Sequence, residues 1–300
     1  MTNPVSAAAA ALLRRRGPGW PALLEELPDP PAQLHITGVA GALQGPCLAI
    51  VGTRRATARG LAVARTLGAH LAARGWTVVS GLALGIDGAA HQGALDAGGP
   101  TVAVMATGPD ETYPAAHRGL RRRIEAAGCA VTERGPGSPP VTYAFPRRNR
   151  LIAGLCRGVI VVEAPARSGA LWTAQLAVDG NREVFAVPGP VDLETSRGCH
   201  QLLREGAHLL ESAADVDRVL GRPEAAPRDA GQDGGPPQPA AGSAARWILD
   251  RVDLEGTARD LLRARWPGTE AAWGEGLLAL ELAGLIRRLP GGLLARTIWR

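Results

Sequence analysis

Short aliphatic runs recur along the chain between residues 47 and 187, and most of them end close to a glycine, proline or serine. Runs that are apolar on both faces are typical of strands in a parallel sheet whose two faces are covered by helices. The predicted strands are Cys47–Val51, Thr77–Ser80, Thr101–Met105, Ala130–Thr132, Val159–Glu163 and Val184–Val187.

Alanine-rich segments with helical spacing lie between these runs, and each is followed by a glycine, the usual residue just past a helix end. The predicted helices are Arg59–Arg74, Asp87–Ala97, Arg118–Ala127 and Leu171–Asp179. Strands that alternate with helices predict an α/β fold. We expect an extended Rossmann-like, doubly wound parallel sheet over residues 45–220.

Residues 1–44 have a different pattern, rich in alanine and proline. Prolines at positions 28, 30 and 31 exclude a long helix, so we expect a loosely packed lead-in with one short helix near Trp20–Leu27. Residues 221–242 contain only Gly, Pro, Ala and polar or charged residues, which cannot fill a core. This composition predicts a flexible linker.

Helical periodicity returns after the linker. The expected elements of residues 243–300 are helices at Ala244–Val252, Thr257–Arg265 and Glu270–Ala283 and a hairpin of Leu285–Leu289 with Leu293–Ile298. Three helices and a hairpin in so short a segment predict a small C-terminal winged-helix domain.

All 33 basic residues are arginines, and the formal net charge is +5. This modest excess is compatible with a nucleic-acid partner, but coding bias gives the same composition, so the positions of the arginines must decide. The four cysteines are far apart and lack zinc-ligand spacing. With no signal peptide and no apolar stretch of about 18 residues, we expect a cytoplasmic chain without a membrane span, metal or cofactor.

Two connections between strand and helix could hold an anion. The first reads Gly52-Thr53-Arg54-Arg55-Ala56-Thr57, and the second reads Ser80-Gly81-Leu82-Ala83-Leu84-Gly85-Ile86-Asp87. The first leads directly into a helix, whose N–H groups attract anions. In the second, the glycines allow close approach of a ligand, and Asp87 is placed as a helix N-cap. Tight turns with solvated arginines and a structural cap explain the same residues.

The run Tyr143-Ala144-Phe145-Pro146-Arg147-Arg148-Asn149-Arg150 is more specific, because three arginines, an amide and two aromatic residues stand together. We expect Pro146 to keep the chain extended until a helix begins near Asn149, so that the arginines gather at its N-terminal end. Arginine forks suit phosphate oxygens, and Phe145 offers a face for a base. Arg54→Ala and Arg148→Ala are each expected to weaken binding and leave the fold intact.

A fourth connection, Arg167-Ser168-Gly169-Ala170-Leu171-Trp172-Thr173, again begins a helix, with Ser168 as its cap. Loops that follow parallel strands meet at one edge of the sheet, so all four connections are expected to converge on one crevice. A catalytic set of Ser80, His91 and Asp87 can be drawn, but Asp87 is better explained as a cap. No sequence motif of a hydrolase or a nucleotide-binding loop is present.

Seven motifs, taken in order, resemble those of the DNA-processing protein A (DprA/Smf) family of bacterial recombination mediators. They are Gly52-Thr53-Arg54, Ser80-Gly81-Leu82-Ala83 with Gly85-Ile86-Asp87, Tyr113-Pro114, Phe145-Pro146-Arg147-Arg148-Asn149-Arg150, Ser168-Gly169 with Thr173-Ala174, Val187-Pro188-Gly189, and Gly198-Cys199-His200 with Arg204-Glu205-Gly206-Ala207. The resemblance implies a non-catalytic protein that binds and protects incoming single-stranded DNA, forms a homodimer through residues 184–216, and loads the recombinase RecA during natural transformation.

By this resemblance the DNA site would comprise Arg54, Phe145, Arg147, Arg148, Asn149, Arg150, Ser168 and Gly169. The predicted site also includes Gly52, Arg55, Ser80, Gly81 and Thr173 from the connections described above. Leu84 departs from the family pattern because it stands where arginine is usual, and His117 stands where asparagine is usual. The N-terminal helical domain of many members is reduced here to the lead-in.

Two alternatives remain open. Phosphoribohydrolases of the lysine-decarboxylase-like type, which process nucleotide monophosphates, share a similar core, but their PGGxGTxxE stretch is missing at residues 164–170. In the other alternative the winged helix reads the DNA and the core is a scaffold. Its arginines, Arg259, Arg263 and Arg265, lie on the second predicted helix, and the third has none.

Overall fold

A nine-stranded sheet forms the centre of the first of two units, residues 1–226 and 227–300, into which the chain divides. The computed structural model describes residues 10–223, 242–253, 256–282 and 285–296. The strands of the first unit are β1 (Ala11–Arg14), β2 (Gln33–Gly38), β3 (Cys47–Val51), β4 (Thr77–Ser80), β5 (Thr101–Val104), β6 (Cys129–Thr132), β7 (Gly158–Val161), β8 (Glu183–Ala186) and β9 (His208–Leu209). All six predicted strands are confirmed, with ends shifted by up to two residues.

The strands lie in the order β1-β2-β6-β5-β4-β3-β7-β8-β9, and all pairs from β6 to β9 are parallel. From β3 the chain first builds outward through β4, β5 and β6, and then returns to add β7 on the other side of β3. The order therefore reverses between β3 and β7. In open α/β sheets this switch point leaves a crevice beyond the carboxyl ends of the strands.

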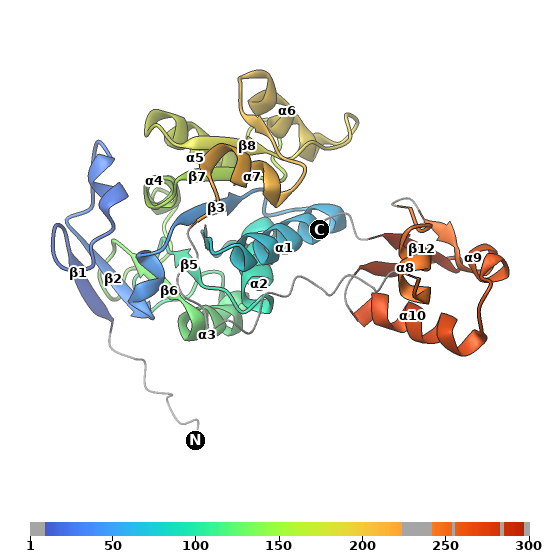
Figure 1. Ribbon diagram of the computed structural model, residues 1–300. Coiled ribbons are helices and arrows are strands. Elements are labelled where there is room, and N and C mark those ends of the chain that lie inside the picture. Colours follow the sequence, from blue (N-terminus) through green and yellow to red (C-terminus); the bar gives the residue numbers. More distant parts are fainter. Residues whose placement is uncertain (1–9, 224–241, 254–255, 283–284, 297–300) are drawn as a thin grey trace. The chain divides into compact units, whose positions relative to one another are not determined.

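Helices cover both faces of the sheet, as the pattern predicted (Figure 1). They are α1 (Ala58–Ala73), α2 (Ile86–Asp96), α3 (Arg118–Ala127), α4 (Ala144–Leu155), α5 (Gly169–Asp179), α6 (Arg197–Arg204) and α7 (Ala213–Leu220). Alternate residues of one strand serve the two faces. In β5, Val102 and Val104 belong to the core under α4 and α5, whereas Ala103 belongs to the core under α3.

Residues 10–44 of the lead-in correct the sequence prediction, because they contribute two strands to the sheet. Strand β2 pairs antiparallel with β6, and β1 pairs antiparallel with β2. Leu34 and Ile36 of β2 are buried in the same core as Trp20 and Leu24. The prolines do exclude a long helix, but two alternating apolar residues suffice to bury one face of a short strand. The predicted short helix is present as a 3₁₀ turn at Ala22–Glu26.

The second unit contains α8 (Ala244–Leu249), α9 (Arg259–Arg265) and α10 (Glu270–Leu282), and β10 (Thr257–Ala258), β11 (Ile286–Leu289) and β12 (Leu293–Arg296) form an antiparallel sheet. Ile248, Leu249 and Trp273 are buried in its core. The winged-helix interpretation stays a prediction. Most of the predicted linker, residues 224–241, lies outside the described residues.

All four cysteines are buried and free, and burial raises the pKa of the Cys47 thiol to about 12. Within the described ranges, no cluster of His, Cys, Asp and Glu side chains could hold a metal ion. In the same ranges, no helix has the length and apolarity needed to cross a membrane.

Candidate nucleic-acid interface

A groove with a volume of about 410 Å³ opens at the carboxyl ends of β3 and β7, at the switch point of the sheet. Its walls are the loop after β3, the first turns of α4, and the loop that leads into α5. The predicted site residues that line it are Gly52, Arg54, Arg55, Phe145, Arg148, Asn149, Ser168, Gly169 and Thr173. The crevice expected from the strand order is therefore present at the expected edge.

Glu163, a buried acid that the sequence analysis did not single out, fixes the loop after β3. Its carboxylate accepts hydrogen bonds from Thr57 N at 2.9 Å and Thr57 Oγ1 at 2.5 Å, and its carbonyl oxygen accepts one from Thr53 N at 2.7 Å. A side chain at Gly60 would collide with this carboxylate. The signal in the sequence was an acid placed directly after an apolar strand.

The carboxylate of Glu163 thus occupies the N-terminal end of α1, where the helix dipole favours negative charge. This corrects the expectation that the helix end itself receives an anionic ligand. Arg54 and Arg55 remain exposed in front of it, at the groove. Binding of an anion by this loop therefore depends on the arginine side chains.

Helix α4 begins earlier than the sequence predicted, at Ala144 instead of near Asn149. Pro146 lies in the first turn, where a missing backbone N–H costs no intrahelical hydrogen bond. The arginines that follow are consequently spread around the helix by its 100° per residue, and do not gather at one end. Arg148 faces inward, whereas Arg147 is exposed on the outer side.

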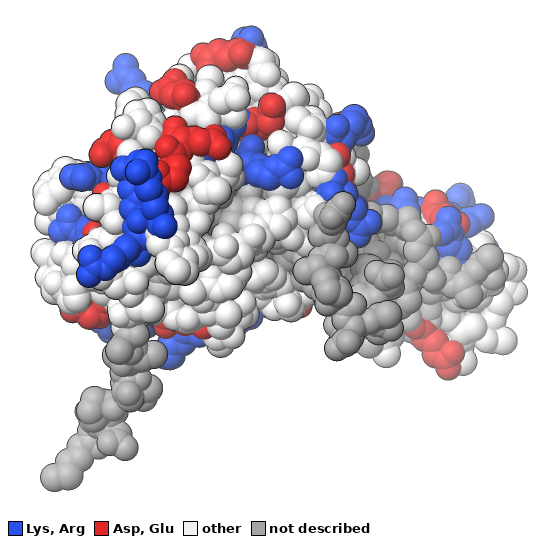
Figure 2. All heavy atoms as spheres, turned by 60° about the vertical axis from the view of Figure 1, so that its left-hand side comes forward, with Lys and Arg blue, Asp and Glu red and all other residues white. Residues whose placement is uncertain are grey.

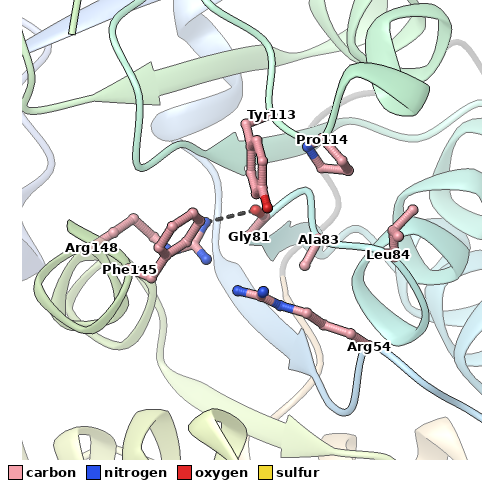
Figure 3. A pocket seen from close by; sticks show the side chains of 8 residues that line it. All are labelled: Arg54, Gly81, Ala83, Leu84, Tyr113, Pro114, Phe145 and Arg148. Atoms are coloured by element: carbon pink, nitrogen blue, oxygen red, sulfur yellow. Dashed lines mark hydrogen bonds between the residues drawn. The ribbon is translucent and has the colours of Figure 1, made fainter. Parts of the chain in front are cut away.

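Arg148 is only 8% exposed and links the carboxyl ends of two strands. Its Nη1 donates to Gly81 O at 2.6 Å, drawn as a dashed line in Figure 3, and also to Val104 O. Burial lowers the pKa of Arg148 to about 10, and the charge of Asp87 opposes this shift. The guanidinium edge still lines the groove, so this side chain belongs both to the core and to the site.

Asp87 is not the cap of α2, because Gly85 precedes the helix and Asp87 lies inside its first turn. The buried carboxylate instead accepts from Gly81 N at 3.1 Å and Ala83 N at 3.4 Å. Burial raises the pKa of Asp87, and the nearby charge of Arg148 lowers it. Asp87 and Arg148 together hold the loop after β4 from two sides.

Ser80 is too deeply buried to contact a ligand, whereas Gly81 lines a small pocket next to the groove. Ser80 is fully buried, and its hydroxyl donates to Ile50 O at 2.6 Å. Gly81 is buried against Arg148, where a side chain would meet the guanidinium. His91 Nδ1 lies 2.7 Å from Thr101 Oγ1, and among the described residues no hydrogen bond joins His91 to Ser80 or Asp87.

Phe145 has an arginine and a second aromatic ring as neighbours in the small pocket next to the groove (Figure 3). The Arg54 Cζ atom is 5.2 Å from the centre of the Phe145 ring, and the ring centres of Phe145 and Tyr113 are 5.5 Å apart. Leu84, which is 46% exposed, forms the far wall. His117 Nδ1 lies 2.9 Å from Leu82 O, which places it beside the loop after β4.

Arg147 and Arg150 lie outside the groove lining, and their contact with DNA stays a prediction. Arg150 Nη2 lies 2.6 Å from Glu133 Oε2, and Arg150 Nη1 donates to Asp29 O at 2.6 Å. Arg147 Nε lies 3.6 Å from the same Glu133 oxygen. Both side chains point to the loop after β6, on the side of α4 away from the groove lining.

The opposite wall of the groove is the N-terminal end of α5. Ser168 caps this helix by accepting from Ala170 N at 3.3 Å, as predicted. Thr173 Oγ1 and Asn149 Nδ2 both donate to Gly169 O, at 3.3 and 3.4 Å. Arg167 is exposed at the same wall.

Positive charge is unevenly distributed over the surface of this protein. On the face shown in Figure 2, blocks of arginine stand next to acidic side chains, so the net charge of +5 does not describe any one site. At the groove, Arg54, Arg55 and Arg167 form no ion pair with any described residue. Three guanidinium groups without ion pairs, one of them over the Phe145 ring, suit a ligand with both phosphates and flat bases.

Known proteins with related sequences support one family. The sequence model described as DNA recombination-mediator protein A matches residues 11–220. Protein Smf of Escherichia coli K12 is 39% identical over 278 residues, which cover 91% of this chain and 74% of that protein. The DprA protein of Mycobacterium tuberculosis H37Rv is 46% identical over 240 residues, 79% of this chain, but the match spans only 58% of that relative's length.

Solved structures agree with the sequence matches. The crystal structure of DNA processing protein A from Streptococcus pneumoniae superposes with a TM-score of 0.68 at 41% identity, covering 71% of this chain and 75% of that one. The protein from Helicobacter pylori, whose structure is described for its single-stranded DNA binding mode, gives a TM-score of 0.64 at 30% identity and covers 70% and 95%. The chain therefore belongs to the family of DNA recombination-mediator protein A.

Proposed function

We propose that this chain binds single-stranded DNA in the groove between β3 and β7 and acts as a recombination mediator. The observation that carries the proposal is the pairing of Arg54 with Phe145 at the mouth of a groove that also holds two further free arginines. Arginine provides phosphate contacts, and an aromatic face accepts any base, so the combination suits a single strand without reading its sequence. The Helicobacter pylori relative, described as a single-stranded DNA binder, supports this class of ligand.

The finer parts of the proposal follow from the family resemblance. In them the chain acts in the cytoplasm, protects incoming DNA during natural transformation, and loads RecA as a homodimer formed through residues 184–216. The C-terminal winged helix would be an accessory module. No reaction is assigned to the chain, because the acids beside the groove are committed to the fold. Glu163 holds Thr57, and Asp87 holds the loop after β4. Because these acids are engaged in structural hydrogen bonds, we also do not propose a nucleotide-processing enzyme.

Arg54→Ala is the direct test of the groove. The affinity for an unstructured oligonucleotide is expected to fall, and the slope of log K against log salt to flatten by roughly 0.7 for each phosphate that the variant no longer binds. Fluorescence anisotropy at several salt concentrations, with the same sequence as duplex for comparison, measures both. Arg122→Ala is the matched control, because Arg122 is an exposed arginine on α3, which covers the other face of the sheet. Equal curves for the two variants would place the DNA elsewhere.

A chain that ends at residue 222 is expected to keep its fold and most of its affinity for single strands. All groove residues lie in the first unit, which has its own core. On the exposed side of α10, residues 271, 274, 275, 278 and 279 include no arginine to contact phosphate. Circular dichroism and the same anisotropy assay measure the two properties. Loss of most affinity on truncation would favour the winged helix as the DNA reader.

A further inference from the structure

A second arginine–aromatic pair stands at the start of α4, just outside the groove. Tyr143, the residue before the helix, is 66% exposed, and the Arg134 Cζ atom lies 5.7 Å from the centre of its ring. The pair repeats the composition of Arg54 and Phe145, whose separation is 5.2 Å. Tyr143 has helical backbone angles, and residues two apart on a helix point about 200° away from each other. The two pairs therefore flank the same helix end on opposite sides.

The charges around Tyr143 leave a positive excess. Arg134, Arg147 and Arg150 surround this end of α4, and Glu133 is the acid that pairs with two of them. Arg150 is largely buried in its pair, with Asp29 also close, but the side chain of Arg147 is 61% exposed. Arginines held near an exposed ring provide phosphate contacts next to a stacking surface.

Arg134 also has an unsatisfied donor. Its Nε is buried and has no hydrogen-bond partner among the described residues. Buried donors are nearly always paired in folded proteins, so this atom calls for an acceptor from water or from a ligand. An exposed tyrosine alone would be unremarkable. The exposed ring, the arginine over it and the unpaired donor together make this a site for a ligand with an aromatic plane and an anionic oxygen.

We propose that a bound single strand continues from the groove around the N-terminal end of α4 and makes a second contact with Tyr143, Arg134 and Arg147. This inference rests on the proposed function of the groove. It assigns Tyr143 as a second base-stacking residue and Arg134 and Arg147 as the phosphate contacts beside it. It also gives Arg147, which the structure places outside the groove, a role in binding.

The consequence is a dependence on oligonucleotide length, which separates the two contacts. Single-strand site sizes in other proteins range from about 4 to 16 nucleotides. Oligo(dT) of about 4 nucleotides is therefore expected to occupy the groove alone, and oligo(dT) of about 12 nucleotides to reach both contacts. For the longer oligonucleotide, Tyr143→Ala is expected to lower affinity about tenfold, whereas Tyr143→Phe keeps the ring and the affinity. Arg134→Ala is expected to flatten the salt slope by roughly 0.7. For the shorter one, both alanine variants should bind like the unaltered chain.

Two controls make the experiment decisive. Phe145→Ala should weaken binding at both lengths, and Arg122→Ala at neither. Ultraviolet cross-linking to an oligonucleotide that carries 5-bromodeoxyuridine, with the modified residue located by fragmentation of the peptide, should label Tyr143 at the longer length only and Phe145 at both lengths. One result would overturn the second contact but not the groove. In that result Tyr143→Ala and Arg134→Ala bind the longer oligonucleotide as tightly as Arg122→Ala does, while Phe145→Ala binds it more weakly. If the unaltered chain does not bind single-stranded DNA, both the proposed function of the groove and the second contact are wrong.

Discussion

Arg148→Ala is expected to destabilise the protein by about 3 kcal/mol, because it removes two hydrogen bonds from a charged group, each of which contributes about 1.5–3 kcal/mol. The substitution leaves the carbonyl oxygens of Gly81 and Val104 without their shared donor and removes the charge next to Asp87. Water that enters from the groove can replace these hydrogen bonds only in part, because it supplies no charged donor. This reverses the sequence-based expectation that the substitution leaves the fold intact.

Urea denaturation followed by circular dichroism measures this destabilisation through the shift in midpoint at constant slope. Arg54→Ala is the matched control, because Arg54 is exposed and its removal should change stability by no more than about 0.5 kcal/mol. The double variant Asp87→Asn with Arg148→Ala should be less destabilised than the sum of the two single variants, because the two groups interact. An Arg148→Ala protein as stable as Arg54→Ala would show that the side chain does not bond the two loops.

Phe145→Ala is expected to lower the affinity for single-stranded DNA by about 1–3 kcal/mol, roughly 5- to 150-fold, with little change in the salt slope. The ring supplies a stacking surface and carries no charge, so the number of phosphate contacts stays nearly the same. Its removal also deprives Arg54 and Tyr113 of a neighbour.

Anisotropy titrations at two or more salt concentrations separate the contributions of Phe145 and Arg54. Phe145→Trp, which keeps an aromatic face, serves as the control and should retain most of the affinity. A Phe145→Ala variant whose slope flattens as much as that of Arg54→Ala would mean that the ring acts only by positioning the arginine. Unchanged affinity would exclude base stacking at this position.

The central sheet was predictable because its strands are apolar on both faces and its helices end at glycines. The lead-in was not, because the prolines that exclude a helix near residue 30 say nothing about a strand. In β2 the apolar residues on the buried face are Leu34 and Ile36, and two alternating apolar residues are too few to distinguish a strand from a loop.

At the site, the sequence predicted where the groove lies but not how deeply each of its residues is buried. Arg54 and Ser168 lie in short loops between a strand and a helix, and their positions follow from the topology alone. The burial of Arg148 depends on the carbonyl groups of Gly81 and Val104, which reach it from distant parts of the chain. An arginine run therefore indicated the right helix, but the neighbours of each arginine could be known only from the folded chain.

The hydrogen bonds of Glu163 fix the loop after β3 and so affect which oligonucleotides the groove prefers. Glu163 follows β7 and Thr57 follows β3, so their hydrogen bonds join the two sides of the switch point before any DNA arrives. A groove organised in advance gives up little conformational entropy on binding, and most of that cost falls on the flexible oligonucleotide. Strands whose bases stack weakly on one another rearrange most easily. A preference of the protein for one base composition would then result from the stiffness of the free oligonucleotide and not from recognition of its bases.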